Sequence, residues 1–135
     1  EDYLAKTKAW NTAHPEKRRE NNDANRRRRR ARILGVESER ILISVLFERD
    51  GGKCGICGGM VSKHPRDPMM RPSHDHIVPL SKNGPDTYAN SQLAHLRCNI
   101  SRGNRDIADV KLKACPNRPH TTFPLLTHAN RKSLI

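Results

Sequence analysis

Two pairs of metal-binding side chains with the same short spacing constrain this chain more than any other feature. Cys54 and Cys57 are separated by two residues, and so are His95 and Cys98. Zinc takes four nitrogen or sulfur ligands in a tetrahedron, and such pairs let two turns supply two ligands each. The sequence therefore predicts a closed, structural zinc site. The alternative for a C-x-x-C pair is a redox site, but no thioredoxin-like pattern surrounds it. Cys115 is left over, and we expect an unpaired thiol with no special role.

A structural metal suits the composition of the chain. Of its 135 residues only 34% are hydrophobic and 4% aromatic. Apolar burial alone gives such a small domain a marginal fold, which metals or disulfides commonly reinforce. Cysteines spaced for zinc indicate a reducing, intracellular compartment. The longest apolar run, residues 41–47, is too short to span a bilayer, so no membrane partner is expected.

Positive charge is concentrated near the N-terminus. The formal net charge is +12, and residues 1–35 supply half of it, with eleven basic against five acidic residues. A surface of this kind favours a polyphosphate partner, and we predict that this arm binds DNA. The contacts are expected from Arg26, Arg27, Arg28, Arg29 and Arg30. The arm could be a helix that forms against phosphates or an extended, disordered segment; a targeting patch or a solvated tail is the plainer alternative.

The other predicted elements are short. Apolar residues recur with helical spacing between a Ser38 N-cap and Gly51-Gly52, which predicts one helix there. Short strands are expected over residues 77–78 and 92–94, with a basic helix over residues 96–105. The chain then divides into three parts: a basic arm (1–35), a zinc-stapled core (36–110) and a proline-containing tail (111–135).

A second group of chemically active residues lies between and beside the zinc pairs. Asp75 precedes His76, Asn90 follows His76 by fourteen residues, and Asn99 follows nine residues later. Hydrolysis of a phosphodiester needs an activated water, a charge sink for the phosphate oxygens and help for the leaving oxyanion. Histidine suits proton removal near neutral pH, and carboxylate and amide oxygens suit a hard divalent ion. An isolated Asp-His pair would be read as a surface pair, but this combination favours a catalytic site.

Residues 74–103, HDHIVPLSKNGPDTYANSQLAHLRCNISRG, resemble the HNH endonuclease pattern, in which D-H-I-x-P-L-S leads to N-x-Q-L and C-N-x-x-K-G. The resemblance implies a small α+β protein with a ββα-metal core, in which two strands and a helix hold one divalent ion. By position it implies that His76 is the general base and that Asp75 and Asn99 bind magnesium or manganese. It also implies that Asn90 holds the long loop so that His76 points correctly.

The resemblance covers about residues 42–105 and includes the run FERDGGKCGICG at the start of the zinc module. Two positions depart from the family pattern. His95 replaces the more usual first cysteine of the second pair, which keeps a zinc ligand, and Arg102 stands where the family often has lysine. Arg102 or Arg105, on the predicted helix that carries Asn99, could clamp the phosphate and stabilise transition-state charge.

The role of His74 stays open between two interpretations. In an extended strand it shares a face with His76, so it could contact substrate or a metal-bound water. As a single extra histidine it could equally form a local hydrogen bond. Strict alternation also places Asp75 on the opposite face, so the strand has to end or twist if both residues serve one site.

These features predict a metal-dependent endonuclease that hydrolyses DNA phosphodiester bonds. One site nicks one strand, so double-strand cutting would need a homodimer or a second event. A phage terminase is a further candidate partner, because the arm resembles those of small phage proteins. The alternative is a non-catalytic zinc-knuckle DNA-binding or packaging-accessory protein, which explains the charge and the zinc but not the Asp75, His76, Asn90 and Asn99 set. No recognition-helix pattern indicates a preferred DNA sequence.

Overall fold

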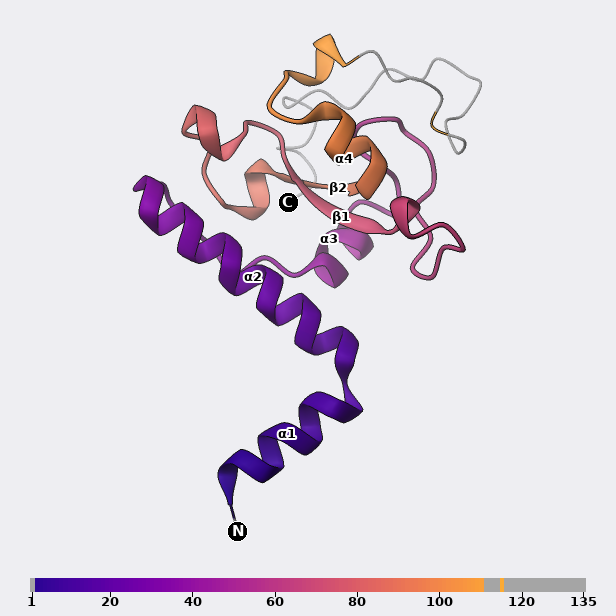
Figure 1. Ribbon diagram of the computed structural model, residues 1–135. Coiled ribbons are helices and arrows are strands. Elements are labelled where there is room, and N and C mark those ends of the chain that lie inside the picture. The colour runs from indigo at the N-terminus through magenta and orange to yellow at the C-terminus, as the bar shows by residue number, and fades with distance from the viewer. Residues whose placement is uncertain (1, 111–114, 116–135) are drawn as a thin grey trace.

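The structure, a computed structural model, describes residues 2–110 and Cys115. Within these residues four α-helices and one two-stranded sheet form a small α+β protein, which confirms the predicted fold class (Figure 1). Apart from Cys115, the predicted tail lies outside the described residues. The elements are α1 (Tyr3–Ala13), α2 (Pro15–Leu34), α3 (Ile43–Arg49), β1 (Pro72–His76), β2 (Ser91–His95) and α4 (Leu96–Arg102).

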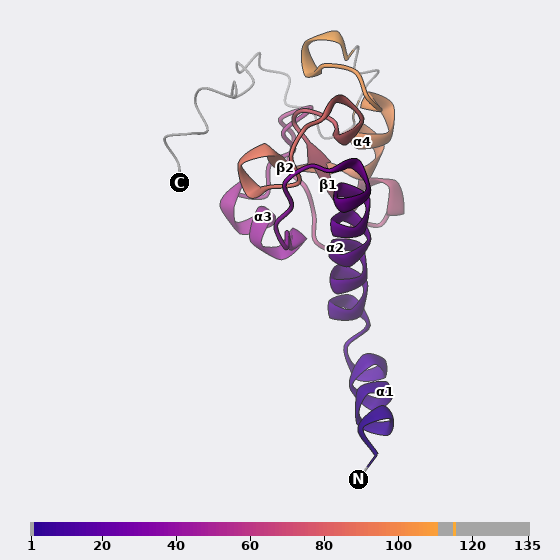
Figure 2. The ribbon, with the colours of Figure 1, turned by 90° about the vertical axis from the view of Figure 1, so that its left-hand side faces the viewer.

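The two antiparallel strands set the positions of the functional residues. Pro72 pairs with His95 at one end of the sheet, and His76 pairs with Ser91 at the other. Figures 1 and 2 show the sheet between α3 and α4, and both helices contact both strands. Because α4 follows β2 directly, the order strand, strand, helix matches the predicted ββα core.

The first strand lies earlier in the sequence than predicted. It ends at His76, so the strand predicted over residues 77–78 is wrong. The Ile77 N–H still donates to the Asn90 carbonyl oxygen at 2.8 Å. The backbone of Val78, however, bonds to the side-chain amide of Asn90, through both its N–H and its carbonyl oxygen. Strand pairing therefore ends where a side chain replaces the backbone partner.

The third helix begins at Ile43 and has no side-chain cap, so the predicted Ser38 N-cap is wrong. Ser38 forms an isolated parallel bridge with Asp86, and the Glu39 N–H donates to the Asp86 carbonyl oxygen at 2.7 Å. This pairing keeps the backbone extended ahead of the helix. At the other end, Arg49 donates to the carbonyl oxygens of Tyr88, ahead of β2, and Ser91, its first residue, and so fastens α3 to the sheet.

The arginine-rich segment is helical, which decides between the helical and the disordered arm. Ala24 and Ala31, two turns apart on one face of α2, are 1% and 0% exposed. Glu20 accepts hydrogen bonds from the backbone N–H and the hydroxyl of Ser44, at 2.8 and 2.7 Å. Arg27 Nη2 donates to the Ile41 carbonyl oxygen at 2.8 Å. The second helix is thus packed on the core and does not trail from it.

The first helix has a different environment from the second. It extends away from the sheet in both views of the ribbon (Figures 1 and 2). It ends before His14, and Pro15 occupies the first position of α2, where a missing N–H costs nothing. None of the helices described is both long and apolar enough to cross a membrane.

The buried apolar residues gather around the cysteines. Ile56, Val61, Met70 and Leu93 form one cluster with the zinc-spaced cysteines, and Phe47 of α3 packs against it. With Ala94, these are the buried members of the cluster other than cysteines, which is a small number of apolar side chains around a metal site. A metal at its centre would therefore contribute much of the stability.

Candidate functional site

The four residues predicted to bind zinc come together at one end of the sheet. Cys54, Cys57, His95 and Cys98 are all buried, and their ligand atoms lie within 4.8 Å of one another. His95 Nδ1 is 3.4 Å from Cys57 Sγ and 3.7 Å from Cys98 Sγ. Zinc bonds of about 2.0–2.3 Å put tetrahedral ligands about 3.3–3.8 Å apart, so these separations fit one ion. The buried Cys₃His group therefore fits a structural zinc, as predicted.

The tautomer of His95 also suits a ligand. Its Nε2 lies 2.9 Å from the Met60 carbonyl oxygen. A carbonyl oxygen only accepts, so Nε2 carries a proton and Nδ1 is the nitrogen that faces the sulfurs and would bind the ion. Burial opposes a charged imidazole here, yet bonds to Cys54 and Cys57 raise the pKa of His95 to about 10. The sulfurs thus favour a positive charge among them, which a bound zinc would supply.

The loop with the first cysteine pair is folded against β2. The Gly55 N–H donates to the Leu93 carbonyl oxygen at 2.7 Å, and the Cys54 N–H donates to Gly59 at 2.8 Å. Gly58 has a φ of 76°, in the left-handed region that glycine adopts at little cost. The glycines of the knuckle therefore allow the tight turn that brings Cys57 back to the sheet.

Cys115 lies against the zinc set, a contact that the sequence analysis did not predict. It is 6% exposed, and its Sγ lies 3.5 Å from Cys57 Sγ and 3.7 Å from His95 Nδ1. It is nevertheless outside the group of four whose ligand atoms are all mutually close. Cys115 thus packs a fifth donor against the quartet. Nothing in the spacing of the cysteines indicates this contact, because it joins residues 58 positions apart.

At the other end of the sheet two histidines share one face of β1. The rings of His74 and His76 meet edge to face, with centroids 4.4 Å apart. His76 Nε2 lies 2.8 Å from Asp86 Oδ1, and its side chain is 14% exposed against 1% for Asp86. Burial, and next the electrostatic effect of His76, lower the pKa of His74 to about 2, so His74 is neutral.

Asp86 is a site residue that the sequence analysis missed. Its backbone is fixed from both sides: its N–H donates to Glu37, and its carbonyl accepts from Glu39. Its second carboxylate oxygen accepts from the Ser38 hydroxyl at 3.2 Å. In the sequence it is one aspartate in a Gly-Pro-Asp turn, and only the tertiary fold brings it to His76. It holds the ring by the hydrogen bond described above.

Asp75 points to the other face of β1, toward α4. Its Oδ2 accepts from Gln92 Nε2 and from Arg102 Nη1, both at 2.6 Å. Burial raises the pKa of Asp75, although the bonds from Gln92 and Arg102 oppose this. Arg102 is 1% exposed and also donates to the backbone carbonyls of His76 and Ile77. Its guanidinium therefore holds Asp75 and the end of β1.

Asn99 lies one turn before Arg102 on the same face of α4. Its Nδ2 donates to Ser73 Oγ at 2.8 Å and to the His74 carbonyl oxygen at 2.9 Å. Among the described residues, none donates a hydrogen bond to Asn99 Oδ1. Asp75 and Asn99 thus both lie where α4 crosses β1, and the oxygens they offer are of the kind that a hard divalent ion prefers.

Asn90 fastens the two ends of the loop after β1. Its Oδ1 accepts from the Val78 N–H at 2.9 Å, and its Nδ2 donates to the carbonyls of Val78 and Pro85, at 3.0 and 2.7 Å. The loop closes so tightly that a Cβ on Gly84 would lie 1.9 Å from the Val78 carbonyl oxygen. Glycine is therefore required there, and Asn90 sets the path of the chain that leads to Asp86.

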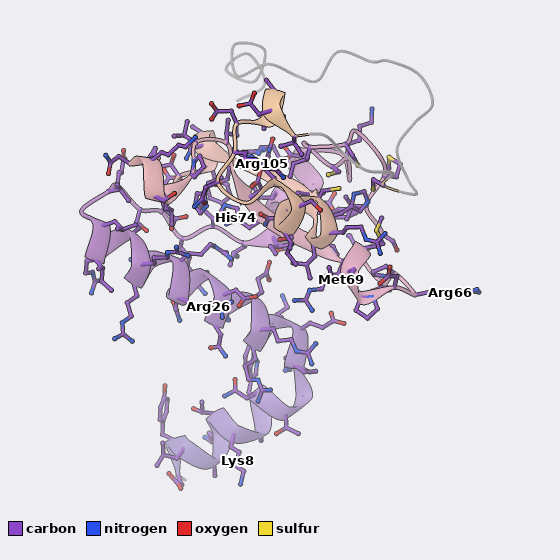
Figure 3. All side chains as sticks on the ribbon, turned by 45° about the horizontal axis from the view of Figure 1, so that its top comes forward. Lys8, Arg26, Arg66, Met69, His74 and Arg105 are labelled. Carbon is purple, nitrogen blue, oxygen red and sulfur yellow. The ribbon has the colours of Figure 1, made fainter. Side chains whose placement is uncertain are left out.

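The predicted DNA-binding arginines differ in exposure. Arg26, Arg28, Arg29, Arg30 and Arg105 are exposed, whereas Arg27 is half-buried against the core. Desolvation lowers the pKa of Arg27, and the charge of Asp86 opposes this shift. Figure 3 places Arg26 on α2 and Arg105 beyond α4, well apart from Lys8 on α1.

Comparison with protein families agrees with this arrangement. The model of the HNH endonuclease family matches residues 54–105. Over these residues the match confirms the predicted family, and it supports a nuclease of the HNH type. No curated protein matches the chain closely enough to count as a relative. The match supports DNA as the partner but lends no support to a homodimer or to a terminase partner.

Proposed function

We propose that this protein is a divalent-metal-dependent endonuclease that hydrolyses DNA, with His76 as its general base. The observation that carries the proposal is the pairing of a partly exposed His76 with the buried carboxylate of Asp86, within the segment that matches the HNH family. A histidine held in one orientation beside a site that solvent can reach is suited to remove a proton from water.

In this proposal Asp86 is a positioning residue. Its carboxylate accepts the Nε2–H of His76 at 2.8 Å, which leaves the lone pair on Nδ1. Nδ1 then takes the proton of the attacking water, and the carboxylate stabilises the imidazolium that results, as in other His-Asp pairs. Asn90 acts one step further away, because it holds the loop that carries Asp86.

Asp75 and Asn99 would hold the catalytic ion, magnesium or manganese. When bound, such an ion acts as a Lewis acid on the phosphate and on the leaving oxygen. Asp75 keeps Oδ1 for this purpose while Oδ2 is bonded to Gln92 and Arg102. Asn99 keeps its amide oxygen, because its nitrogen makes the bonds to β1.

DNA would lie along the basic face of α2 and reach the end of the sheet near His76. The exposed arginines of α2 contribute affinity through phosphates without reading sequence. Arg105 is the exposed arginine beside α4 and is the phosphate contact in this proposal, since Arg102 is engaged inside the protein. The arm (1–35), the nuclease core (36–110) and the tail (111–135) remain the proposed division of the chain.

Plasmid nicking tests the proposal. Zinc-loaded protein should convert supercoiled plasmid to the open circle with magnesium or manganese, and EDTA added just before the assay should stop it. Asn99→Ala should raise the metal concentration needed, whereas Asn104→Ala, an exposed asparagine just beyond α4, should not. Asp75→Asn is preferable to Asp75→Ala, because its amide oxygen still accepts a hydrogen bond from the buried Arg102. Both variants lose the ion pair, and removing one partner of a buried pair costs about 3–5 kcal/mol when nothing replaces it.

Two outcomes would contradict the proposal. Folded protein that binds DNA without nicking it under any of these ions would favour the non-catalytic zinc-knuckle alternative. Nicking that survives EDTA, or an Asn99→Ala protein with the metal response of the wild type, would remove the proposed ion site.

A further inference from the structure

A second group of metal-binding side chains lies at the end of the sheet opposite the zinc quartet. His74, His76 and Asp86 each offer one ligand atom, and these atoms lie within 4.8 Å of one another. Two imidazole nitrogens and one carboxylate oxygen are a donor set that zinc and similar borderline ions accept. Magnesium, which prefers oxygen ligands, is a poorer match.

The hydrogen bonds around His74 fix its tautomer. The Ser91 hydroxyl donates its only proton to the Thr87 carbonyl oxygen at 2.6 Å. His74 Nε2 lies 2.7 Å from the same Ser91 oxygen, so the imidazole has to be the donor in that bond. The Nε2–H tautomer leaves a lone pair on His74 Nδ1. Histidine ligands of metals commonly show this arrangement, with one nitrogen held by a hydrogen bond and the other presented to the ion.

That Nδ1 atom has no hydrogen-bond partner, although it is buried. His74 is 8% exposed, and its Nδ1 is one of three buried side-chain polar atoms without a partner among the described residues. A buried polar atom left unbonded costs about 1–3 kcal/mol, so it calls for a physical reason. A bound cation would satisfy the lone pair. Figure 3 shows His74 within the packed elements, unlike the projecting Arg66.

The other two ligands need little movement to bind an ion. His76 Nε2 and Asp86 Oδ1 are 2.8 Å apart and share a proton. Ligand bonds of about 2.0–2.1 Å would place these atoms about 3.3 Å apart, an opening of about half an ångström. The ion would take the lone pair of His76 Nε2, and the ring proton would move to Nδ1, so that His76 binds as a neutral imidazole. With His74 and Asp86 buried and His76 14% exposed, the ion would enter from the His76 side.

We propose that His74, His76 and Asp86 bind one zinc ion, or a similar borderline divalent ion, in addition to the structural zinc. Three protein ligands leave a fourth position for water. The ion would occupy His76 Nε2 and leave the ring proton on Nδ1, the atom proposed to take the proton of water, so His76 could not act as the base. This regulatory consequence rests on the proposed nuclease function, but the binding itself does not.

Binding is measured by titrating protein that already holds one zinc per chain with Zn²⁺ in a calorimeter. The wild type should take up one further equivalent. His74→Gln keeps a donor for Ser91 and removes the Nδ1 lone pair, so it should weaken this second binding at least about tenfold. Asp86→Asn should do the same. His64→Gln, a change at an exposed histidine in the long loop, is the matched control and should bind like the wild type.

The calorimetric titration alone decides whether the second metal site exists. A wild type that takes up no second equivalent, or a His74→Gln protein that binds like the wild type, would overturn the proposal. If Asp86→Asn does not fold, because it loosens the loop before α3, the His74→Gln result still decides. Circular dichroism shows which variants are folded.

A nicking assay tests the regulatory consequence separately. In wild-type protein, Zn²⁺ added in excess of the structural equivalent should inhibit magnesium-dependent nicking at the concentration that fills the second site. His74→Gln, compared with its own rate without added Zn²⁺, should need at least about ten times more. Equal inhibition of both proteins would overturn the regulatory part. A chain that binds the second Zn²⁺ but never nicks DNA would contradict the proposed function and leave the site standing.

Discussion

The two ends of the small sheet carry similar side chains in different surroundings. At one end His95 is joined by three cysteines, all four side chains are buried, and one ion would have every ligand position filled by protein. At the other end His76 is partly exposed beside one buried carboxylate, with His74 behind it. Strands of five residues place the two ends of the sheet, at His95 and at His76, about 13 Å apart.

This difference indicates which end of the sheet stabilises the fold and which end carries the proposed chemistry. A closed set of ligands ties the knuckle, β2 and α4 together, so its ion contributes to the free energy of folding. An open set leaves one side of the histidine to water and phosphate, which is what a general base needs. Changes at the first end should therefore affect folding, and changes at the second should affect rate.

The largest expected effect is the loss of the fold when the closed end is opened. Cys57→Ser should lose zinc and unfold, because the binding of a structural zinc is commonly worth about 10 kcal/mol or more in small domains. Circular dichroism and zinc content measured on the same sample check this. A Cys57→Ser protein that lacks zinc but keeps native helix content and melting temperature would contradict the structural role of this zinc site.

A large effect on rate is expected from Asp86→Asn at the open end. An amide at this position would donate to His76 Nε2 and favour the opposite ring tautomer, with its proton on Nδ1. The rate of nicking should fall by about 10²–10⁴, the range of general-base help. Nitrogen NMR of the His76 ring reports the tautomer directly. A tautomer and rate unchanged by Asp86→Asn would mean that Asp86 does not position the base.

A smaller effect is expected on DNA affinity when α2 loses exposed charge. Deleting the arm is a poor test, because Ala24 and Ala31 are buried against the core. Changing Arg28, Arg29 and Arg30 together to glutamine keeps the helix and should lower the log–log salt slope of duplex binding by about three units if each contacts a phosphate. Zinc content and melting temperature should stay the same. An unchanged salt slope would mean that α2 does not bind DNA.

The smallest effect is expected from Cys115→Ser, which sharpens the definition of the closed end. Cys115 touches the quartet but is outside the four mutually close ligands. The variant should keep one zinc per chain and lose about 1 kcal/mol of unfolding free energy. Loss of zinc comparable to that of Cys57→Ser would instead make Cys115 a ligand.

The zinc end could be predicted from sequence because its ligands are restricted in type and locally spaced. Two x₂ pairs have few other uses, and the matched family pattern lies around them. The contact of Cys115 was missed for the opposite reason. Cys115 lies 58 positions after Cys57, so no local spacing links the two residues, and only the tertiary fold brings them together. Asp86 was missed in the same way, since its partner His76 is found only through the loop that Asn90 closes.

The element boundaries show how tertiary contacts override local signals. Ser38 is a good capping residue, but pairing with Asp86 draws it into an extended bridge. The arginine run repels itself in isolation, and contacts with the core favour the packed helix: Ala24 and Ala31 are buried, and Glu20 and Arg27 bond to the core. The sequence shows helix propensity and capping residues, but it does not show the tertiary contacts that decide which of these local signals the structure follows.

One measurement tests the central claim most directly: nicking and melting temperature of His76→Ala, measured on one zinc-loaded preparation beside His64→Ala. His76→Ala should keep its zinc, its DNA binding and a melting temperature close to that of the wild type, and lose about 10²–10⁴ in single-turnover rate. His64→Ala should match the wild type in all four. A His76→Ala protein that nicks DNA at the wild-type rate would contradict the account, whatever its stability.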